Sequence, residues 1–170
     1  WLTLYAGIAG GADIILIPEI PYSMESVINA ISKRTQNGKH FTIIAVAEGV
    51  ISKEEAQMPK KKLKELRAKE AGKYPSAAYR LGAKIEELCG HEVRVTVPGH
   101  VQRGGSPTVF DRLLASRLGV RAVELLLDGQ SARVVGIRDD KIIDMEIHEA
   151  LSMKKEFDKK SYQMAQILSI

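Results

Sequence analysis

The segment from Asp13 to Gly49, "DIILIPEIPYSMESVINAISKRTQNGKHFTIIAVAEG", determines the fold that we expect for this chain. It begins and ends with the apolar runs "DIILIP" and "HFTIIAVAEG", which are typical of buried strands in a parallel sheet. Between them, Ser23 is placed to cap a helix that ends at Asn37-Gly38. The inward residues of this helix would be Val27, Ile28 and Ile31. Strand, helix and strand with short connections predict a right-handed βαβ unit, and hence a three-layer α/β/α fold with a mainly parallel sheet.

Further elements are expected on both sides of this unit. "WLTLYAGIAGGAD" predicts a helix stopped by Gly10-Gly11, with one face made of Leu2, Tyr5, Ala6 and Ala9. "PSAAYRLGAKIEELCG" (75–90) predicts an amphipathic helix, and "EVRVTVPG" (92–99) a third strand. The inward residues of that helix would be Ala78, Leu81, Ile85 and Leu88. Because the chain opens with Trp1 inside a helix already under way, we expect it to be part of a longer polypeptide.

The C-terminal third predicts helices around a hairpin. Ser106 as N-cap and Pro107 as first residue would begin a helix that ends at Gly119, followed by a second helix ending at Gly129. "ARVVGIRDDKIIDMEI" predicts a β-hairpin that turns at Asp139-Asp140. Two short helical stretches complete the chain.

Composition and charge narrow the class of protein. The 170 residues are 45% hydrophobic and 27% charged, which fits one globular domain with its own core. No apolar run approaches the ~20 residues that span a bilayer, and there is no secretory signal. Cys89 is the single cysteine, which excludes an intrachain disulfide and a cysteine zinc cluster and fits a cytoplasmic location.

The net charge of +4 is a mild bias toward anionic ligands. Six of the eleven residues 60–70 are Lys or Arg, which leaves a nucleic-acid contact as one alternative. No aromatic residue is interleaved for base stacking, and Glu65 lies four residues before Lys69 in the order that supports an exposed helix. We therefore expect a solvated helix, and neither a nucleic acid nor a membrane as partner.

The stretch "PGHVQRGGSP" (98–107) places His100 and Arg103 directly before a Gly-Gly turn, at the carboxyl end of the expected third strand. Ligands of open α/β sheets bind at this end of the strands. Cationic side chains that converge near a helix N-terminus can capture a phosphate, although an ordinary surface loop is the alternative.

The whole block "GHVQRGGSPTVFDRLLASRLGVRAVELLLDG", with "LTLYAGIAGGADIILIPE" and "IIAVAEG" upstream, resembles the C-terminal half of the 6-phosphofructokinase family. The resemblance runs from Leu2 to about Gly136 and is weakest over 51–88, where this chain is longer than the compact bacterial enzymes. It implies an incomplete phosphofructokinase fold. It also implies phosphoryl transfer to the 1-hydroxyl of fructose 6-phosphate, which gives fructose 1,6-bisphosphate in glycolysis.

The family's substrate-binding positions match Glu48, Arg94, His100 and Arg103. Arg103 and His100 suit the 6-phosphate, and Glu48 at a strand end suits the sugar hydroxyls. The resemblance also implies a homo-oligomer, tetramer or dimer, in which Arg94 reaches a neighbouring subunit. The alternatives are a surface carboxylate for Glu48, a pairing of Arg94 with Glu92 or Asp144, and a structural loop role for His100 or Arg103.

The resemblance implies an allosteric nucleotide site at Gly11, Asp13 and Lys39. Compact bacterial members usually carry glutamate at the position of Asp13 and a basic residue at that of Asn37, so we do not expect conventional activation by ADP.

The family's catalytic aspartate motif and donor-binding loop have no match here, so we assign no catalytic and no metal-binding residue to this chain. Mg²⁺ and ATP, or pyrophosphate, would be bound mainly by an N-terminal half, and this chain alone would be inactive. We expect residues 1–105 to form the fructose 6-phosphate domain, 106–148 to pack on the other half, and 149–170 to form C-terminal helices. Without that half, Leu113, Leu125 and Leu126 would be exposed.

Three functions remain open at this point. The first is the substrate-binding half of an ATP-dependent enzyme, with a pyrophosphate-dependent enzyme as its variant. The second is a non-catalytic sugar-phosphate-binding module, and the third an RNA-binding domain built on the lysine-rich run.

Overall fold

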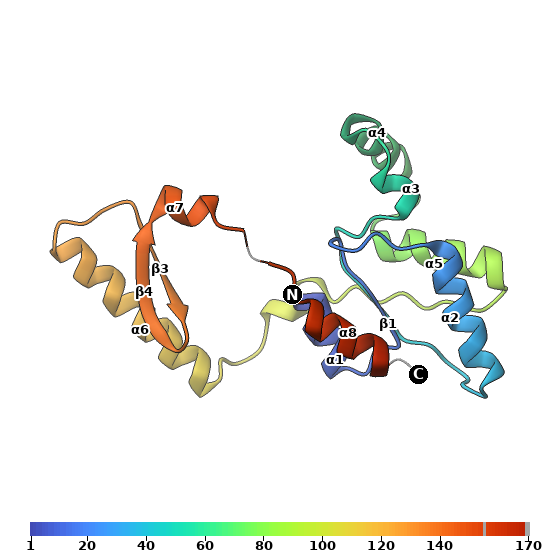
Figure 1. Cartoon of the computed structure of the whole chain (residues 1–170), viewed down its shortest axis with the longest axis horizontal. Helices are drawn as coiled ribbons and strands as arrows, with labels where there is room; N and C mark the ends of the chain where they lie inside the picture. The colour runs from blue at the N-terminus through green and yellow to red at the C-terminus, as the bar shows by residue number, and fades with distance from the viewer. Residues whose placement is uncertain (155, 169–170) are drawn as a thin grey trace. The chain divides into compact units, whose positions relative to one another are not determined.

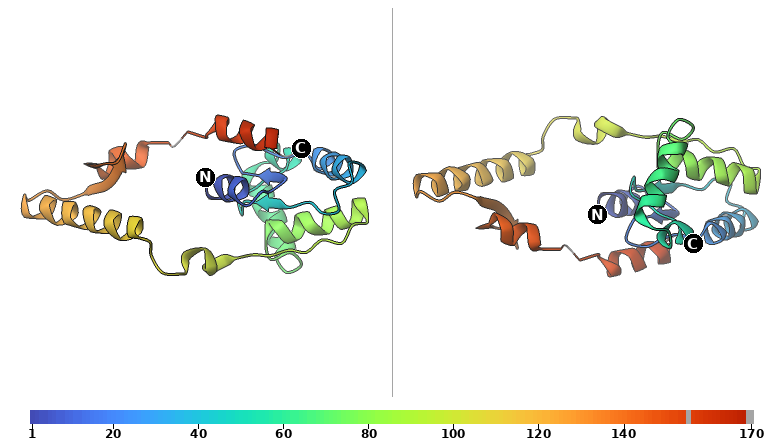
Figure 2. Two further views of the ribbon diagram at one scale, coloured as in Figure 1. Left: turned by 90° about the horizontal axis from the view of Figure 1, so that it is seen from below. Right: turned by 90° about the horizontal axis from the view of Figure 1, so that it is seen from above.

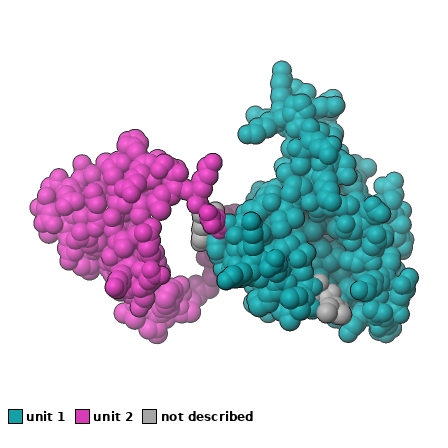
Figure 3. Space-filling model, viewed as in Figure 1, with its two compact units in different colours: residues 1–97, 157–170 teal, residues 98–156 magenta. Residues whose placement is uncertain are grey.

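The computed structural model describes residues 1–154 and 156–168, which divide into two compact units. Unit 1 contains residues 1–97 and the C-terminal residues from 157, and unit 2 contains residues 98–156 (Figure 3). No helix in this described part of the chain is long and apolar enough to cross a membrane.

The predicted βαβ unit lies in unit 1 (Figure 1). Strand β1 (Ile14–Leu16) pairs in parallel with β2 (Ile44–Val46), and helix α2 (Met24–Gln36) connects them. Ser23 caps α2 as predicted, because its Oγ accepts a hydrogen bond from the backbone N–H of Ser26 at 3.4 Å. Both strands are shorter than the apolar runs that predicted them.

Helices cover both faces of this small sheet (Figures 1 and 2). Helix α1 (Leu2–Ala9) contacts α8 (Lys159–Leu168), and α2 contacts α5 (Ala77–Cys89). Successive strand residues point to opposite faces, so Ile15 and Leu16 belong to different cores. One core contains Leu4, Ile15, Ile17 and Ala165. The other contains Leu16, Val27, Ile31, Val50, Leu81 and Ile85.

The predicted inner face of α1 is wrong. Leu2, Tyr5, Ala6 and Ala9 are exposed, whereas Leu4 and Gly7 are buried. Gly7 decides the orientation, since a Cβ there would lie 2.7 Å from Cδ1 of Ile15. Because glycine has no side chain, this turn of α1 can approach the sheet closely. Apolar residues lie on every side of the helix, so its buried face could not be identified from the spacing of apolar residues. In α5, Leu81 and Ile85 are buried as predicted but Leu88 is exposed.

The predicted third strand is not formed within the described residues. Val93 and Val95 are half-buried against Gly82, while Glu92, Arg94 and Thr96 are exposed, so the predicted alternation of faces is present. A strand also needs a backbone partner, and no ladder to residues 92–97 forms here, so the sheet of unit 1 has two strands. The structure is an α/β fold with two small sheets, one parallel and one antiparallel.

The lysine-rich run forms helix α4 (Lys60–Glu70) with no fully buried residue, which confirms the predicted solvated helix. It follows the short α3 (Lys53–Ala56). Glu55 of α3 joins both helices to α5 through ion pairs with Arg67 at 3.6 Å and Arg80 at 3.5 Å. Arg67 also donates a hydrogen bond to the carbonyl of Val50 at 3.0 Å. These polar contacts attach helices α3 and α4 to the rest of unit 1.

Unit 2 contains the 3₁₀ turn η1 (Gly99–Arg103), helix α6 (Val109–Leu127), the hairpin β3 (Arg133–Arg138) and β4 (Lys141–Glu146), and helix α7 (Ile147–Ser152). The hairpin turns at Asp139 (φ 50°) and Asp140 (φ 60°), which confirms the predicted turn. Positive φ at both positions is the geometry of a two-residue hairpin turn.

Two predictions for α6 are wrong. The helix begins after Thr108, not Ser106, because Thr108 Oγ1 accepts from the N–H of Asp111 and Asp111 caps the N–H of Thr108 in return. Gly119 does not end it, and α6 continues to Leu127, just before Gly129 at φ 72°. A glycine ends a helix where positive φ is required, and Gly119 does not have it.

Candidate functional site

His100 and Arg103 lie on η1, the single turn of 3₁₀ helix that opens unit 2. A 3₁₀ helix has three residues per turn, so positions i and i+3 lie on the same side. Both residues are exposed. Gly99 (φ 55°) begins the turn and Gly105 (φ 91°) follows it, both in backbone conformations that other residues rarely adopt. The two glycines therefore shape a loop that presents an imidazole and a guanidinium together.

The chemistry of this pair suits an oxyanion. A guanidinium donates several hydrogen bonds in a planar fork that matches phosphate, and a ring N–H of histidine adds a further donor. Within the described residues, Arg103 has no ion pair with a carboxylate of this chain. Its side chain is thus available to a ligand.

Glu48 and Arg94 belong to unit 1. Glu48 lies in the turn directly after β2, where it is exposed, as expected for a residue at the carboxyl end of a parallel strand. Arg94 is 87% exposed and its Nε donates to Oε1 of Glu92 at 2.9 Å. Of the two pairings considered from the sequence, the one with Glu92 is found.

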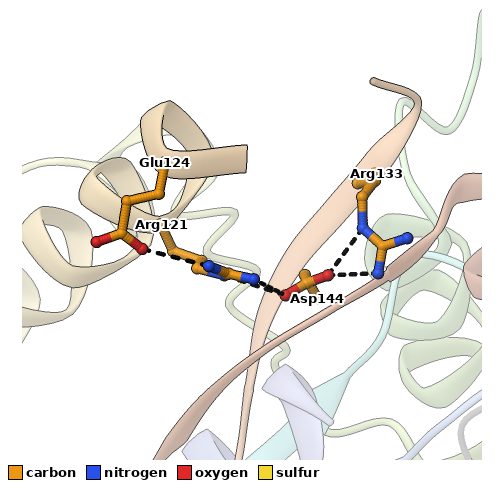
Figure 4. Close-up of polar contacts among 4 residues, drawn as sticks. All are labelled: Arg121, Glu124, Arg133 and Asp144. Carbon is orange, nitrogen blue, oxygen red and sulfur yellow. Dashed lines mark hydrogen bonds and ion pairs between the residues drawn. The ribbon is translucent and has the colours of Figure 1, made fainter. Parts of the chain in front are cut away.

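Asp144 is not the partner of Arg94, because two other arginines bind it (Figure 4). Arg121 of α6 donates to Oδ1 from Nε and Nη2 at 3.1 and 2.8 Å, and Arg133 of β3 donates to Oδ2 from Nε at 2.8 Å. Hydrogen bonds from Arg121 and Arg133 lower the pKa of Asp144. Arg121 also pairs with Glu124 at 3.3 Å, so the four residues fasten the hairpin to α6.

Each of the two units therefore carries two of the four predicted substrate-binding residues. Glu48 and Arg94 lie on unit 1, and His100 and Arg103 lie on unit 2. All four are exposed, and His100 and Arg103 lie three residues apart on the same 3₁₀ helix.

The proposed effector residues have a different environment. Asp13 forms an ion pair with Arg34 at 2.7 Å through Oδ1, and its Oδ2 accepts a hydrogen bond from the N–H of Ile43 at 2.8 Å. Gly11 has a φ of 67°, and Lys39 is exposed. Both oxygens of Asp13 are thus bound within the chain. Sequence reasoning missed Arg34, although a cation in the last turn of a crossover helix was the available signal.

Residues 1–154 and 156–168 contain no group of three His, Cys, Asp or Glu side chains that could hold a metal ion.

A family model described as Phosphofructokinase matches residues 1–126. The chain belongs to the phosphofructokinase family. This phosphofructokinase chain is 53% identical over 169 residues to the ATP-dependent 6-phosphofructokinase of Clostridioides difficile (strain 630), covering 99% of the chain and 45% of that protein. It is 46% identical over 169 residues to the ATP-dependent 6-phosphofructokinase of Bacillus thuringiensis (strain Al Hakam), with the same coverage of 99% and 45%. The chain thus spans less than half the length of these curated relatives.

Solved phosphofructokinases share its fold. The structure of phosphofructokinase from Saccharomyces cerevisiae matches with a TM-score of 0.67 and 28% identity, over 99% of this chain and 20% of that one. The pyrophosphate-dependent phosphofructokinase from Marinobacter aquaeolei matches with a TM-score of 0.68 and 20% identity, over 99% of this chain and 44% of that one.

Proposed function

We propose that this chain is the substrate-binding, C-terminal half of an ATP-dependent 6-phosphofructokinase. The complete enzyme transfers a phosphoryl group from ATP to the 1-hydroxyl of fructose 6-phosphate in glycolysis. The single observation that carries the substrate assignment is the placement of His100 and Arg103 on one side of an exposed turn, within the residues that match the family.

In this proposal, Arg103 and His100 bind the 6-phosphate by charge-assisted hydrogen bonds. Glu48 accepts hydrogen bonds from sugar hydroxyls at the end of β2. Arg94 serves the site of a neighbouring subunit in a homotetramer or homodimer, which fits a side chain that is 87% exposed and paired only with an exposed carboxylate among the described residues. These residues hold and orient the sugar phosphate, and positioning is most of what phosphoryl transfer requires of a protein.

The rest of the machinery belongs to the other half in this proposal. That half supplies the catalytic aspartate, the ATP-binding loop and the magnesium ligands, so this chain alone is inactive. The division into segments 1–105, 106–148 and 149–170 stays a prediction for the complete enzyme. A mainly parallel sheet of more than two strands also stays a prediction.

ATP is favoured as donor over pyrophosphate. The relatives that are 43% to 53% identical are named ATP-dependent, whereas the likeness to the pyrophosphate-dependent structure, at 20% identity, shows the fold alone. A non-catalytic sugar-phosphate-binding module is the second candidate, because it would need only the phosphate-binding turn that we propose at His100 and Arg103.

We also infer that a nucleoside diphosphate does not activate the enzyme through Asp13. Arg34 and the N–H of Ile43 already bind one oxygen each, so a metal-bound nucleotide would compete with them for this carboxylate. Addition of ADP to the complete enzyme should leave its half-saturating concentration of fructose 6-phosphate unchanged, and a clear decrease would contradict the inference.

Calorimetric titration of the chain with fructose 6-phosphate, with glucose 6-phosphate as control, tests the substrate assignment. Hydrogen bonds to charged groups contribute about 1.5–3 kcal/mol each, so Arg103→Ala should weaken binding by about tenfold to a hundredfold or more. Arg138→Ala removes an exposed arginine of the same unit and should leave binding unchanged.

The outcomes separate the candidates. Equal affinity in a folded Arg103→Ala variant would overturn the phosphate assignment. Selective binding by the chain, combined with no phosphoryl transfer by the complete polypeptide, would favour the non-catalytic module.

Arg94→Ala should weaken binding only in samples shown by ultracentrifugation to be oligomeric.

A further inference from the structure

The turn that carries Glu48 is closed by a backbone hydrogen bond. The N–H of Val50 donates to the carbonyl of Ala47 at 3.2 Å. Glu48 and Gly49 are therefore the two central residues of a β-turn directly after β2. Ala47 donates its own N–H to the carbonyl of Leu16 on β1 at 2.9 Å, and the side chain of Val50 is 2% exposed in the core. Both ends of the turn are thus fixed to unit 1, and the exposed Glu48 lies between them.

An arginine of the lysine-rich helix binds the end of this turn. Arg67 lies on α4, which follows the short α3 and projects from unit 1 (Figure 1). Its Nη2 donates a hydrogen bond to the carbonyl of Val50 at 3.0 Å, across a separation of 17 residues in the chain. The N–H of Val50 therefore closes the turn, while its carbonyl is held from α4.

Glu55 orients the guanidinium of Arg67. Its Oε2 accepts a hydrogen bond from the N–H of Ser52 at 2.9 Å and lies 3.6 Å from Nη2 of Arg67. Its Oε1 lies 3.5 Å from Nη2 of Arg80 on α5. The side chain of Glu55 is 11% exposed, so salt screens these pairs only weakly. Arg67 is thus directed at the turn by a carboxylate that is itself attached to α3 and α5.

We propose that Arg67 is a positioning residue for sugar binding, because it holds the turn that presents the carboxylate of Glu48. The inference rests on the proposed function, since that function assigns Glu48 to the hydroxyls of fructose 6-phosphate. A loop that is already held in its binding geometry loses less conformational freedom when the ligand binds. Arg67 supplies this support from outside the site and does not itself contact the sugar.

A second ion pair attaches α4 at another place. Oε2 of Glu70, the last residue of α4, lies 3.5 Å from Nη1 of Arg80 on α5. The side chains of Glu70 and Arg67 are each 33% exposed. Loss of either should loosen α4, but only loss of Arg67 should change the position of Glu48. Glu70 therefore provides a matched control for a general effect of the helix.

Steady-state kinetics of the complete enzyme test the proposal. Arg67→Met keeps an unbranched side chain without a donor, and it should raise the KM for fructose 6-phosphate by about threefold to tenfold, as expected when part of a charge-assisted hydrogen bond is lost to binding. The kcat and the KM for ATP should stay unchanged, because the lost interaction serves sugar binding alone. Arg67→Lys keeps a charged donor and should raise the KM less. Glu70→Ala should leave it unchanged.

A double-mutant cycle distinguishes positioning of Glu48 from a general loss of stability. In a Glu48→Ala background, Arg67→Met should cause no further increase in the KM for fructose 6-phosphate, because the carboxylate that Arg67 positions is gone. Effects of the two substitutions that multiply would show that Arg67 acts independently of Glu48. An equal increase in Glu70→Ala would assign the effect to the whole helix. Either result overturns the proposal.

Amide hydrogen exchange tests the support of the turn without any ligand. In the complete polypeptide, Arg67→Met should speed the exchange of the Val50 N–H by about tenfold, because the turn opens more often. The N–H of Asp13, which is bonded to the carbonyl of Ile43 before the two strands begin, is the internal reference and should not change.

The exchange result separates the two proposals. Unchanged exchange at Val50 would overturn the support by Arg67, whatever the kinetics. Faster exchange at Val50 with an unchanged KM for fructose 6-phosphate would show that the turn is held by Arg67 but that Glu48 does not bind the sugar. In a polypeptide that binds no fructose 6-phosphate, faster exchange would leave the support by Arg67 in place, and the proposed function would fail.

Discussion

Single carboxylates hold distant parts of each unit together. Asp13 ties the end of α2 to the segment before β2 through Arg34 and Ile43. Asp144 ties β4 to α6 and to β3 through Arg121 and Arg133 (Figure 4). In both, a short acidic side chain accepts bonds from two directions, so its loss would leave a cation without its partner.

The stability of the hairpin should decrease in acid because of Asp144. Its pKa is lowered by the two arginines, so the ionised form stabilises the fold above the unfolded pKa of about 3.9. This contribution is lost as the pH falls below about 3.9 and through the folded pKa. Hydrogen exchange of β4 amides between neutral and acidic pH would measure it. The loss should be absent in Asp144→Asn and retained in Asp139→Asn, a control at the hairpin turn.

Three glycines affect the helices in different ways, according to their surroundings and their backbone angles. Gly7 lets α1 pack against Ile15, and Gly129 provides the positive φ that follows α6. Gly119 does neither, since a Cβ there would meet no atom within 4 Å and its φ is not positive. It is a helix-interior position of the isolated chain, where glycine is only a cost in conformational entropy.

Gly119→Ala should therefore stabilise the isolated chain by about 0.5–1 kcal/mol, because alanine is the better helix former. Gly129→Ala should destabilise it by roughly 1–2 kcal/mol, since a left-handed conformation is unfavourable for alanine. Urea unfolding followed by circular dichroism would measure both. A loss of stability in Gly119→Ala would instead mean that α6 breaks there, as the sequence predicted.

At the scale of the whole molecule, unit 2 buries little apolar surface. Leu125 is 3% exposed, but its neighbour Leu126 is 67% exposed, and other apolar side chains of α6 are exposed with it. The exposed set is Val109, Phe110, Leu113, Val120, Val123 and Leu127. Such a patch indicates contact with another protein surface. The prediction of exposure from the sequence is confirmed for Leu113 and Leu126 and wrong for Leu125.

The two adjacent leucines should respond differently to truncation. Leu125→Ala should destabilise the isolated chain by about 2–5 kcal/mol, because it creates a cavity. Leu126→Ala should change the stability of the isolated chain by about 0.5 kcal/mol or less. In the complete polypeptide, by contrast, Leu126→Ala should lower the midpoint temperature of thermal unfolding. An unchanged midpoint there would contradict the proposal that α6 packs on the other half.

Much of the local structure could be predicted from the sequence. The parallel βαβ unit, the Ser23 cap, the Asp139-Asp140 turn and the solvated α4 follow from patterns whose causes lie within a few residues. The face of α1, the start and continuity of α6 and the third strand were predicted wrongly. The face of α1 and the third strand depend on what packs against the element, namely Ile15 behind Gly7 and a neighbour for residues 92–97. The start of α6 depends instead on the Thr108–Asp111 capping box, a local signal that the prediction missed.

The candidate site shows the same division. The sequence by itself determined that Glu48 would follow a parallel strand and that His100 and Arg103 would share a glycine-flanked loop, because chain direction and spacing fix these features. Only the tertiary structure decided that Arg34 pairs with Asp13 and that Arg121 and Arg133 bind Asp144. Those contacts join residues far apart in the chain, and their formation depends on packing that no local pattern encodes.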